Sequence, residues 1–365
     1  MARSEPGTFG IVGSGWRAQF FPRLARLLPE KLTLVGGVVR RPDNLGPVSS
    51  SWGVPVYLTP EELVTRHQPS FVITSVPRTV NPSLIKRLVD LDTPVLSETP
   101  PAPDVDGLRQ LWADVGDRAM VQVAEQYLLM PLHAARLELV RQGVIGKPTA
   151  IHISSTHDYH AVSMMRAFLG AGYAHATVTA KRVSAPLVNP LKRDGWTDDE
   201  APHEAENLLA VVDFGEAGSA LYDFTDNQWH NQLRFRRLLI RGTHGEIENT
   251  QIVRLIAPRT IVRSELTRSQ LGYDLNLDGY DTEHLAFDGH VVWRNEFLGL
   301  RLMDEEIAVA SIMLKTAAWA ADEAPPPYPL AEASQDHLVN LAIQESANTG
   351  MPVTTGAELW QKGIT

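Results

Sequence analysis

The feature that most constrains this chain is the segment FGIVGSGWRA at residues 9–18, in which an apolar run ends in two closely spaced glycines. Phe9–Val12 predicts a β-strand, and Gln19–Leu28 has the apolar spacing of an α-helix. A strand that turns through glycines directly into a helix is typical of the first part of a nucleotide-binding βαβ unit. The segment therefore predicts a dinucleotide site, provided that strands and helices continue to alternate after it.

Three positions of this segment match the pattern G-x-G-x-x-G/A. Gly13 permits the tight turn, Gly15 lets a pyrophosphate approach the backbone, and Ala18 lets the helix pack closely on the strand. The unpaired amides and the positive dipole end of the helix then face the phosphates. We expect cofactor contacts at Gly13, Ser14, Gly15, Trp16 and Arg17.

Strand and helix patterns alternate through the rest of the first third of the chain. Further strands are predicted at Leu32–Val39, Val54–Tyr57, Phe71–Ser75, Pro94–Leu96 and Met120–Ala124. Helices are predicted from Thr59, which begins a capped TPEEL start, and over Asn81–Leu91 and Asp104–Val115. This alternation predicts right-handed crossovers and a doubly wound parallel sheet, which is a Rossmann domain over residues 1–128.

The pattern changes near residue 130, where a second domain over residues 129–365 is expected to begin. Leu132–Gln142 predicts an amphipathic helix. Alternating segments then predict an open, mainly antiparallel sheet, with strands at Thr149–Ser155, Ala176–Ser184, Asn207–Phe214, Ala220–Asp226, Arg234–Arg241 and Glu246–Ile256. Late helices are predicted at Asp304–Ala321 and Ala331–Asn348, and they can pack back on the first domain.

The composition excludes several classes of function. The 365 residues carry a formal net charge of −10, which argues against a nucleic-acid partner because phosphate binding needs a basic field. The absence of cysteine excludes disulfides, thiolate zinc sites and thiol nucleophiles. No apolar run approaches the ~20 residues needed to span a bilayer, so no membrane partner is expected. The polar start has no signal-peptide core, and we expect a cytoplasmic protein.

The end of the second predicted strand bears on the choice of cofactor. NAD-binding chains place Asp or Glu there to accept hydrogen bonds from ribose hydroxyls. Here the strand ends in VVRRP, and no carboxylate precedes Asp43. The two guanidinium groups of Arg40 and Arg41 suit a 2′-phosphate, so we expect NADP to be favoured over NAD. The alternative is that both arginines form a solvated rim.

In the order of its motifs the chain resembles the Gfo/Idh/MocA family of oxidoreductases over nearly its whole length. The similar segments are FGIVGSGWRA, WGVPVYLTPEELV at 52–64, VLSETP at 95–100, LVRQGVIGKPTAI at 139–151, LLIRGTHGEIE at 238–248 and SANTGMPV at 346–353. The resemblance implies a Rossmann domain followed by an open-faced sheet domain that binds substrate, with the active site between the domains. It also implies a homodimer or homotetramer formed through the open sheet face.

Two family motifs are altered in this sequence. Family members carry Glu-Lys-Pro after the fifth strand, where the Lys helps to take or give the hydroxyl proton; here the motif is Glu98-Thr99-Pro100. They also carry Asp-x-x-x-His, which here runs from Thr156 to His160. The usual relay therefore lacks its Lys and its Asp. The resemblance implies further cofactor contacts at Ser75, Pro77, Glu98, Thr99, Pro100 and Gln126.

His160 is the best remaining candidate for acid–base chemistry, because an imidazole titrates near neutrality and can both accept and donate a proton. If its helix begins near Asp158, His160 lies in the first turn. Asp158 either orients the imidazole or caps the helix Ala161–Leu169. Tyr127, after the sixth strand, either donates to a carbonyl oxygen or buries its ring.

Two further patterns have both functional and structural interpretations. His157 and His160 have a spacing that can bind a metal, but more ligands, such as His203 or Glu204, would have to come from distant segments. We therefore expect no metal. Trp229 offers a flat platform for a sugar ring, or it covers the sheet or fills a subunit contact.

Together these observations predict an NAD(P)-dependent oxidoreductase that acts on a sugar, cyclitol or related polyol, with His160 as the proton carrier. One alternative is still an enzyme: a sugar carbon is oxidised transiently so that a neighbouring bond can be eliminated, without net redox change. The other is a non-catalytic dinucleotide- or sugar-sensing protein on the same fold, which the loss of both Lys and Asp would fit.

Overall fold

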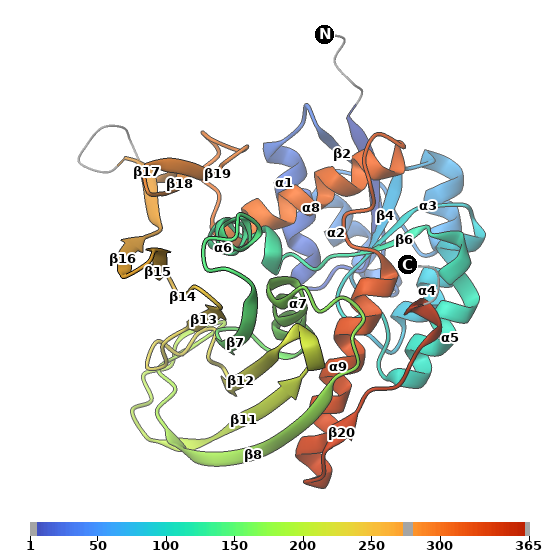
Figure 1. The fold of residues 1–365 in the computed structure, drawn as a ribbon. Coiled ribbons are helices and arrows are strands. Elements are labelled where there is room, and N and C mark those ends of the chain that lie inside the picture. Colours follow the sequence, from blue (N-terminus) through green and yellow to red (C-terminus); the bar gives the residue numbers. More distant parts are fainter. Residues whose placement is uncertain (1–5, 273–279, 362–365) are drawn as a thin grey trace. The chain divides into compact units, whose positions relative to one another are not determined.

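The computed structural model describes residues 6–272 and 280–361, which form two compact units (Figure 1). The first unit comprises Met1–Met130, Gly299–Gln335 and Glu358–Thr365. The second comprises Pro131–Leu298 and Asp336–Ala357. The first unit therefore takes two segments from the late part of the chain, and each unit is described by itself.

The first unit is built on a six-stranded sheet with the order β3-β2-β1-β4-β5-β6, in which every pair of neighbours is parallel. The strands are β1 (Gly7–Val12), β2 (Leu32–Val38), β3 (Val56–Tyr57), β4 (Phe71–Thr74), β5 (Val95–Ser97) and β6 (Val121–Val123). The predicted doubly wound parallel sheet is confirmed. From β1 the chain adds β2 and β3 on one side of the sheet, and then β4, β5 and β6 on the other side. The strand order therefore reverses between β1 and β4, which is where this architecture binds nucleotides.

Helices cover this sheet within the first unit (Figure 1). They are α1 (Phe20–Leu27), α2 (Leu45–Trp52), α3 (Pro60–His67), α4 (Asn81–Asp90), α5 (Val105–Val115), α8 (Asp304–Ala320) and the first turns of α9 (Leu330–Thr349). The late helix α8 packs against α1, β1 and β4. The pattern did not predict α2, which follows a short 3-10 helix at Pro42–Asn44.

Two helix starts of this unit are capped by a side chain; the cap at Thr59 was predicted from the sequence, and the cap at Asp104 was not. The Thr59 hydroxyl accepts a hydrogen bond from the Glu62 N–H at 3.3 Å, and Pro60 takes the first helical position. The Asp104 carboxylate accepts one from the Gly107 N–H at 2.8 Å. Each cap satisfies an amide that would otherwise lack a partner in the first turn.

The second unit is built on a nine-stranded sheet with the order β16-β15-β14-β13-β7-β12-β11-β8-β20. All neighbours are antiparallel except β12 and β7, which are parallel. The strands are β7 (Pro148–Ser154), β8 (Thr177–Leu187), β11 (His203–Asp213), β12 (Ser219–Thr225), β13 (Arg237–Gly242), β14 (Gly245–Glu248), β15 (Gln251–Ala257), β16 (Thr260–Glu265) and β20 (Val353–Thr354). The predicted open, mainly antiparallel sheet is confirmed.

Several smaller elements complete the second unit. The helices of this unit are α6 (Pro131–Arg141), α7 (Asp158–Leu169) and the later part of α9. Helix α7 packs on β7 (Figure 1). The sequence pattern missed the hairpin β9 (Leu191–Lys192) and β10 (Gly195–Trp196), and a three-stranded sheet of β17 (Thr267–Leu271), β18 (Asp281–Phe287) and β19 (His290–Arg294).

Two strand predictions in this unit are wrong. The segment Glu246–Ile256 is two strands, β14 and β15, because Asn249 adopts a left-handed φ of +51° and forms a tight turn with Thr250. The strand predicted from Arg234 begins at Arg237 instead. The preceding residues form a loop whose Phe235 carbonyl accepts a hydrogen bond from the Gln228 amide at 2.9 Å.

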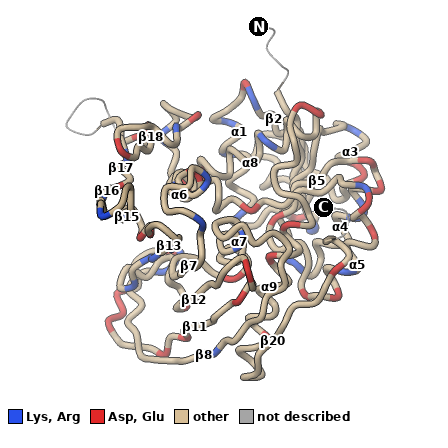
Figure 2. The backbone as a smooth tube through the Cα atoms, in the orientation of Figure 1, with Lys and Arg blue, Asp and Glu red and all other residues tan. Residues whose placement is uncertain are grey.

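The two faces of the large sheet differ in burial. On the face toward α7, Ile153, Tyr222 and Phe224 are buried. On the other face, which we call the outer face, Val211 is 53% exposed and Leu221 is 43% exposed. Lys and Arg are interspersed with Asp and Glu in both units (Figure 2). Within the described part of the chain, no helix combines the length and the apolar character needed to cross a membrane.

Candidate functional site

The predicted cofactor residues of the first unit, and the predicted catalytic residue Tyr127, all follow strands of its parallel sheet. The structure places Gly13, Ser14, Gly15, Trp16 and Arg17 after β1, Arg40 and Arg41 after β2, Ser75 and Pro77 after β4, Glu98, Thr99 and Pro100 after β5, and Gln126 and Tyr127 after β6. Because parallel strands end at one edge, these residues lie along the same edge of the sheet. The sheet order thus brings together positions that are separated by more than 100 residues in the sequence.

Gly13 lies where the ends of β1 and β4 meet. Its N–H donates to the Val38 carbonyl at 2.9 Å, and the Ser75 N–H donates to the Val12 carbonyl at 2.8 Å. Gly13 has a φ of +108°, and a Cβ atom there would lie 2.1 Å from the Ser75 carbonyl oxygen. Glycine is therefore required at this position both for the backbone conformation and for the close approach of β4.

Gly15 is a glycine for a different reason. A Cβ atom built there meets nothing within 4 Å, so space is open above the backbone. The chain then enters a 3-10 turn at Arg17–Gln19 and the helix α1. An open glycine backbone before a helix N-terminus fits a pyrophosphate, which needs close approach to amides and a positive dipole end.

Arg17 lies in a cluster of carboxylates. Its Nε donates to Glu98 Oε1 at 2.8 Å, its Nη1 donates to Glu305 Oε1 at 2.7 Å, and its guanidinium carbon lies 5.0 Å from the centre of the Phe20 ring. Burial lowers the pKa of Arg17, but the two carboxylates outweigh this effect and raise the pKa above its ordinary value. The ion pairs link the glycine loop to the segment after β5 and to α8.

Two arginines follow β2 on the surface. Arg40 and Arg41 are exposed, and among the described residues neither guanidinium has a carboxylate partner. Asp43, the first carboxylate after the strand, lies in the first turn of the 3-10 helix Pro42–Asn44. The end of β2 therefore presents two unneutralised cations, which is the charge that a 2′-phosphate needs.

Thr99 occupies the position that the family resemblance assigns to a Lys. Glu98 is fixed by its N–H, which donates to the Thr74 carbonyl at 2.9 Å, and by the ion pair with Arg17. The Ser97 hydroxyl donates to the Glu98 carbonyl at 2.9 Å, and the Thr99–Pro100 peptide is cis. The segment is therefore held in place, but a threonine hydroxyl cannot take up a proton at neutral pH as an amine can.

The second unit contains a separate group of titratable and aromatic side chains, which we call the histidine cluster: His157, Tyr159, His160, Trp229 and His337. The helix α7 begins at Asp158, so His160 lies in its first turn, as predicted. The ring centres of His157 and His160 are 5.1 Å apart, and those of Tyr159 and His160 are 4.5 Å apart. His160 is buried, with 6% of its surface exposed.

His157 has one fixed protonation state within this cluster. The Trp229 indole N–H donates to its Nδ1 at 3.1 Å, so Nδ1 is an acceptor and the proton of the neutral ring is on Nε2. Burial, together with nearby His160, lowers the pKa of His157 to about 3, although Asp158 opposes the shift. His157 is therefore neutral at physiological pH and can donate a hydrogen bond from Nε2.

Asp158 does not cap α7, and this alternative from the sequence is wrong. It is itself the first helical residue, and its φ of +48° is left-handed. Its N–H donates to the Tyr222 hydroxyl at 3.2 Å, and its Oδ1 accepts from the Gln344 amide at 3.0 Å. Backbone strain of this kind costs about 1–3 kcal/mol and is often found at functional sites.

His337 was missed by the sequence analysis. It lies on α9, and its ring centre is 5.7 Å from that of Tyr159. The adjacent Asp336 forms a buried ion pair with Arg166 of α7, with 2.5 Å between Nη1 and Oδ1. This pair holds α9 against α7 and so places His337 in the cluster. No local pattern in the sequence links positions that are 170 residues apart.

The described residues contain no group of three or more His, Asp or Glu side chains that could hold a metal ion. His203, considered as a distant ligand, has its Nε2 2.8 Å from Asp199 Oδ2 at an exposed position.

The two sheet topologies and the glycine loop after β1 define a class: a Rossmann domain followed by an open-sheet domain. Residues 8–125 match the model of the Gfo/Idh/MocA family, described as an oxidoreductase family with an NAD-binding Rossmann fold. The family resemblance stated from the sequence is thereby confirmed. No curated protein is significantly similar to the chain in sequence.

Solved structures share the fold over nearly the whole chain. An oxidoreductase from Agrobacterium radiobacter in complex with NAD+, L-tartaric acid and magnesium is 16% identical, with a TM-score of 0.68 over 96% of this chain and 98% of that chain. A myo-inositol dehydrogenase from Corynebacterium glutamicum is 16% identical, with a TM-score of 0.65 over 96% and 99%. The WlbA dehydrogenase from Bordetella pertussis, in complex with NADH and UDP-GlcNAcA, is 14% identical, with a TM-score of 0.66 over 98% and 100%.

Proposed function

We propose that this protein is an NAD(P)-dependent oxidoreductase that transfers hydride to or from a carbon bearing oxygen on a sugar, cyclitol or related polyol. The observation that carries the proposal is the pair Gly13 and Gly15 at the point where the sheet order reverses. Gly13 is required by packing against Ser75, whereas Gly15 has nothing above it. When bound there, the nicotinamide supplies the hydride acceptor or donor.

The protein's part in the chemistry is proton transfer, which we assign to His160 with assistance from Tyr127. Thr99 replaces the Lys that would carry the proton. His160 has the only kind of side chain in this sequence whose ordinary pKa is close to neutrality, and it lies beside the neutral imidazole of His157. Asp158 and Tyr222 hold the start of α7 and thus the backbone of His160.

The substrate class and the cofactor preference have separate support. Two of the structures with this fold are a myo-inositol dehydrogenase and a dehydrogenase bound to NADH and UDP-GlcNAcA, which supports a cyclitol or sugar substrate. Arg40 and Arg41, exposed and without carboxylate partners in the described residues, support NADP over NAD. Both points are proposals for this chain.

The decisive experiment compares turnover and nucleotide binding in the same samples. The protein is mixed with NADP or NADPH and a panel of polyols and sugars, and the absorbance of reduced nicotinamide is followed. His160→Gln should lower kcat by about 10²–10⁴-fold, as expected for a general acid–base group, with nucleotide affinity unchanged. His203→Gln, at an exposed position, is the matched control. Full turnover in His160→Gln contradicts the assignment of His160.

The same assay separates the two alternatives. Nucleotide binding without any product over the panel supports a sensing protein, and product without net change in nicotinamide supports oxidation followed by elimination. Either result replaces the dehydrogenase proposal.

We also propose that the protein is a homodimer or homotetramer assembled through the outer face of the second unit. The support is an apolar patch on this face, which consists of Leu209 and Val211 of β11, Leu221 of β12 and Leu239 of β13, with β7 between the last two strands. Exposed apolar patches of this kind on sheet faces are usually covered by a partner. The cytoplasmic location remains a prediction from the sequence.

A further inference from the structure

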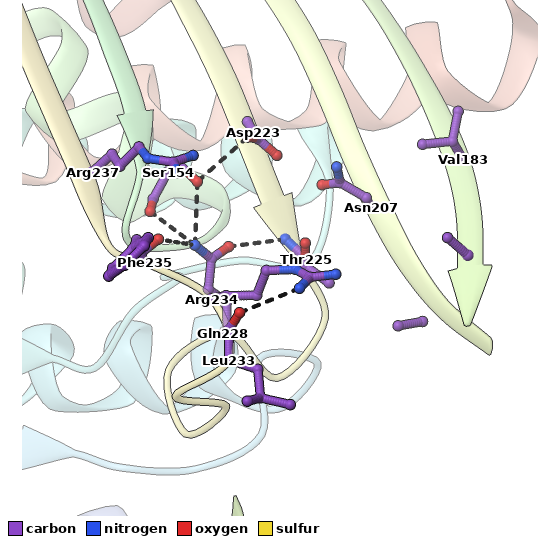
Figure 3. Close-up of a pocket in the computed structure, with 12 residues that line it drawn as sticks. Ser154, Val183, Asn207, Asp223, Thr225, Gln228, Leu233, Arg234, Phe235 and Arg237 are labelled. Atoms are coloured by element: carbon purple, nitrogen blue, oxygen red, sulfur yellow. Dashed lines mark hydrogen bonds between the residues drawn. The ribbon is translucent and has the colours of Figure 1, made fainter. Parts of the chain in front are cut away.

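A pocket of about 340 Å³ opens on the outer face of the second unit, at the ends of β7 and β12 (Figure 3). It is lined by Ser154, Asn207, Asp223, Gln228, Arg234 and Arg237, among others. The strand register explains the grouping: Asn207 is paired with Thr225 on one side and with Val183 on the other. The volume is at the lower end of the range for small-molecule sites.

The floor of the pocket is built from buried polar groups. The Gln228 amide donates to the Ser154 carbonyl and to the Phe235 carbonyl, each at 2.9 Å, and its oxygen accepts from the Thr225 N–H at 3.0 Å. One side chain thus ties together the ends of β7 and β12 and the loop before β13 (Figure 3). Such a floor is ordered before any ligand arrives, which lowers the entropic cost of binding.

The walls present polar groups that remain available to a ligand. In the described part of the chain, neither Arg234 nor Arg237 forms an ion pair with a carboxylate. The Asn207 Oδ1 is buried and has no hydrogen-bond partner there. Among the described residues, the Asp223 carboxylate accepts one side-chain hydrogen bond, from the Ser154 hydroxyl at 3.5 Å. A buried amide oxygen without a donor costs about 1–3 kcal/mol, which a bound hydroxyl group would recover.

We propose that this pocket binds a small polyhydroxy anion, a monosaccharide-sized compound that carries one carboxylate or phosphate group. Arg234 and Arg237 bind the anionic group, because guanidinium forms strong paired hydrogen bonds with carboxylate and phosphate. Asp223 and Asn207 Oδ1 accept hydrogen bonds from the hydroxyls, since neither oxygen can donate. Two cations and one carboxylate give the pocket a net charge of +1, which one anionic group neutralises.

The pocket is connected to the histidine cluster through two consecutive residues. Gln228 forms the floor, and Trp229 donates the hydrogen bond to His157 Nδ1 at 3.1 Å. Because α7 and the pocket lie on opposite faces of the sheet, the anion site is distinct from the cluster. Occupation of the pocket stabilises the loop that carries Trp229 and therefore stabilises the orientation of His157.

The experiment is calorimetric titration of the full chain, without nicotinamide, with D-gluconate and with D-glucose 6-phosphate. Neutral sorbitol and inorganic phosphate are the comparison ligands. Arg234→Ala and Arg237→Ala should each weaken binding of both sugar anions about tenfold, the usual size of a lost charged hydrogen bond. Arg263→Ala, at an exposed position of β16, should leave the affinity unchanged.

A second variant tests the division of roles inside the pocket. Asp223→Asn should weaken D-gluconate and strengthen inorganic phosphate, because it removes a hydroxyl acceptor and a repulsive charge. Hydrogen exchange in the presence of D-gluconate should show protection at residues 226–237.

The possible results divide clearly. Binding of at least one sugar anion that is weakened about tenfold or more in both arginine variants and is accompanied by protection at residues 226–237 supports the proposal. Absence of binding to every sugar anion overturns it, as does equal binding of sorbitol. Binding that is insensitive to Arg234 and Arg237, or protection confined to the start of α7, also overturns it. None of these outcomes depends on nicotinamide, so the dehydrogenase proposal is tested separately.

Discussion

Different parts of the sheet are accessible to ligands in the two units. In the first unit β4, β5 and β6 are short and buried along their whole length. In the second unit β11 and β12 are longer, and buried positions alternate with exposed ones. A sheet covered on both faces leaves only the ends of its strands accessible, so its chemistry lies in loops such as the one at Gly13. A half-covered sheet also offers a face, which here carries an apolar patch and a pocket.

This difference can be traced to sequence patterns. The run FVIT in β4 is apolar at most positions because both of its faces are covered. The run LLAVV in β11 has exposed Leu209 and Val211 between buried Leu208, Ala210 and Val212. Its pattern therefore looks continuously apolar although one face is open, which is expected if a second copy covers that face.

The largest expected effect concerns the covered side of the second sheet. Asp336→Ala removes the buried carboxylate that lies 2.5 Å from Arg166 Nη1, and both side chains are less than 5% exposed. Loss of one partner of a buried pair typically costs about 3–5 kcal/mol of the free energy of unfolding. Thermal or denaturant unfolding should show the loss. Asp288→Ala, in a partly exposed pair with Arg254, is the control and should cost about 0–1 kcal/mol. Equal losses of unfolding free energy in the two variants would contradict the distinction between the buried ion pair and the partly exposed one.

The next effect concerns the strand ends of the first unit. Gly13→Ala places a methyl group 2.1 Å from the Ser75 carbonyl at a φ of +108°, so it should destabilise the fold. The backbone conformation alone costs about 1–3 kcal/mol. Gly15→Ala has no such clash and should unfold like the wild type while binding dinucleotide at least about tenfold more weakly, or ~1.4 kcal/mol. Unfolding curves and nucleotide titrations together test this pair, and a stable Gly13→Ala would contradict the packing argument.

A third prediction sharpens the contrast between faces. Leu221→Asp, on the outer face, should shift the protein from oligomer to monomer in sedimentation or light-scattering measurements. The monomer's own unfolding free energy should change by no more than about 0.5 kcal/mol, because the side chain is exposed there. Ile261→Asp, at an exposed position near the sheet edge, should leave the assembly unchanged. A wild-type protein that is monomeric would contradict the proposal that subunits assemble through the outer face.

Near neutral pH, the smallest effect is the contribution of His157 to the pH dependence of stability. Because the folded pKa of His157 is about 3 and its unfolded pKa is ~6.5, the unfolded chain binds one more proton between these values. Stability should therefore fall as pH drops from 6.5 toward 3, by up to ~1.4 kcal/mol per pH unit from this residue. His157→Gln should lack this contribution, whereas His203→Gln should keep it. Identical pH profiles for His157→Gln and the wild type would show that His157 is not held neutral.

Most of the Rossmann unit could be predicted from the sequence, because local patterns determine its parts, but α2 was missed. Strand runs, the cap at Thr59 and the glycine loop each act over a few residues. The second unit was predicted less well. A positive φ at Asn249 split one predicted strand, and the Gln228 contacts that hold the loop before Arg237 connect separate elements.

In the candidate site, too, local patterns could be predicted from the sequence, whereas contacts between distant segments could not. His160 could be placed at the start of α7 from the order of its neighbours. His337 could not, because only the buried contact between Arg166 and Asp336 brings α9 to the cluster. The carboxylate partners of Arg17 likewise lie 81 and 288 residues away in the sequence.

The central claim is that the strand ends of the first unit hold a dinucleotide. Calorimetric titration of the full chain with NADPH and with NADH tests it most directly. We predict one dinucleotide bound per chain, tighter binding of NADPH than of NADH, and loss of that preference in the double variant Arg40→Ala/Arg41→Ala. A folded wild-type protein that releases no heat with either dinucleotide would contradict the account.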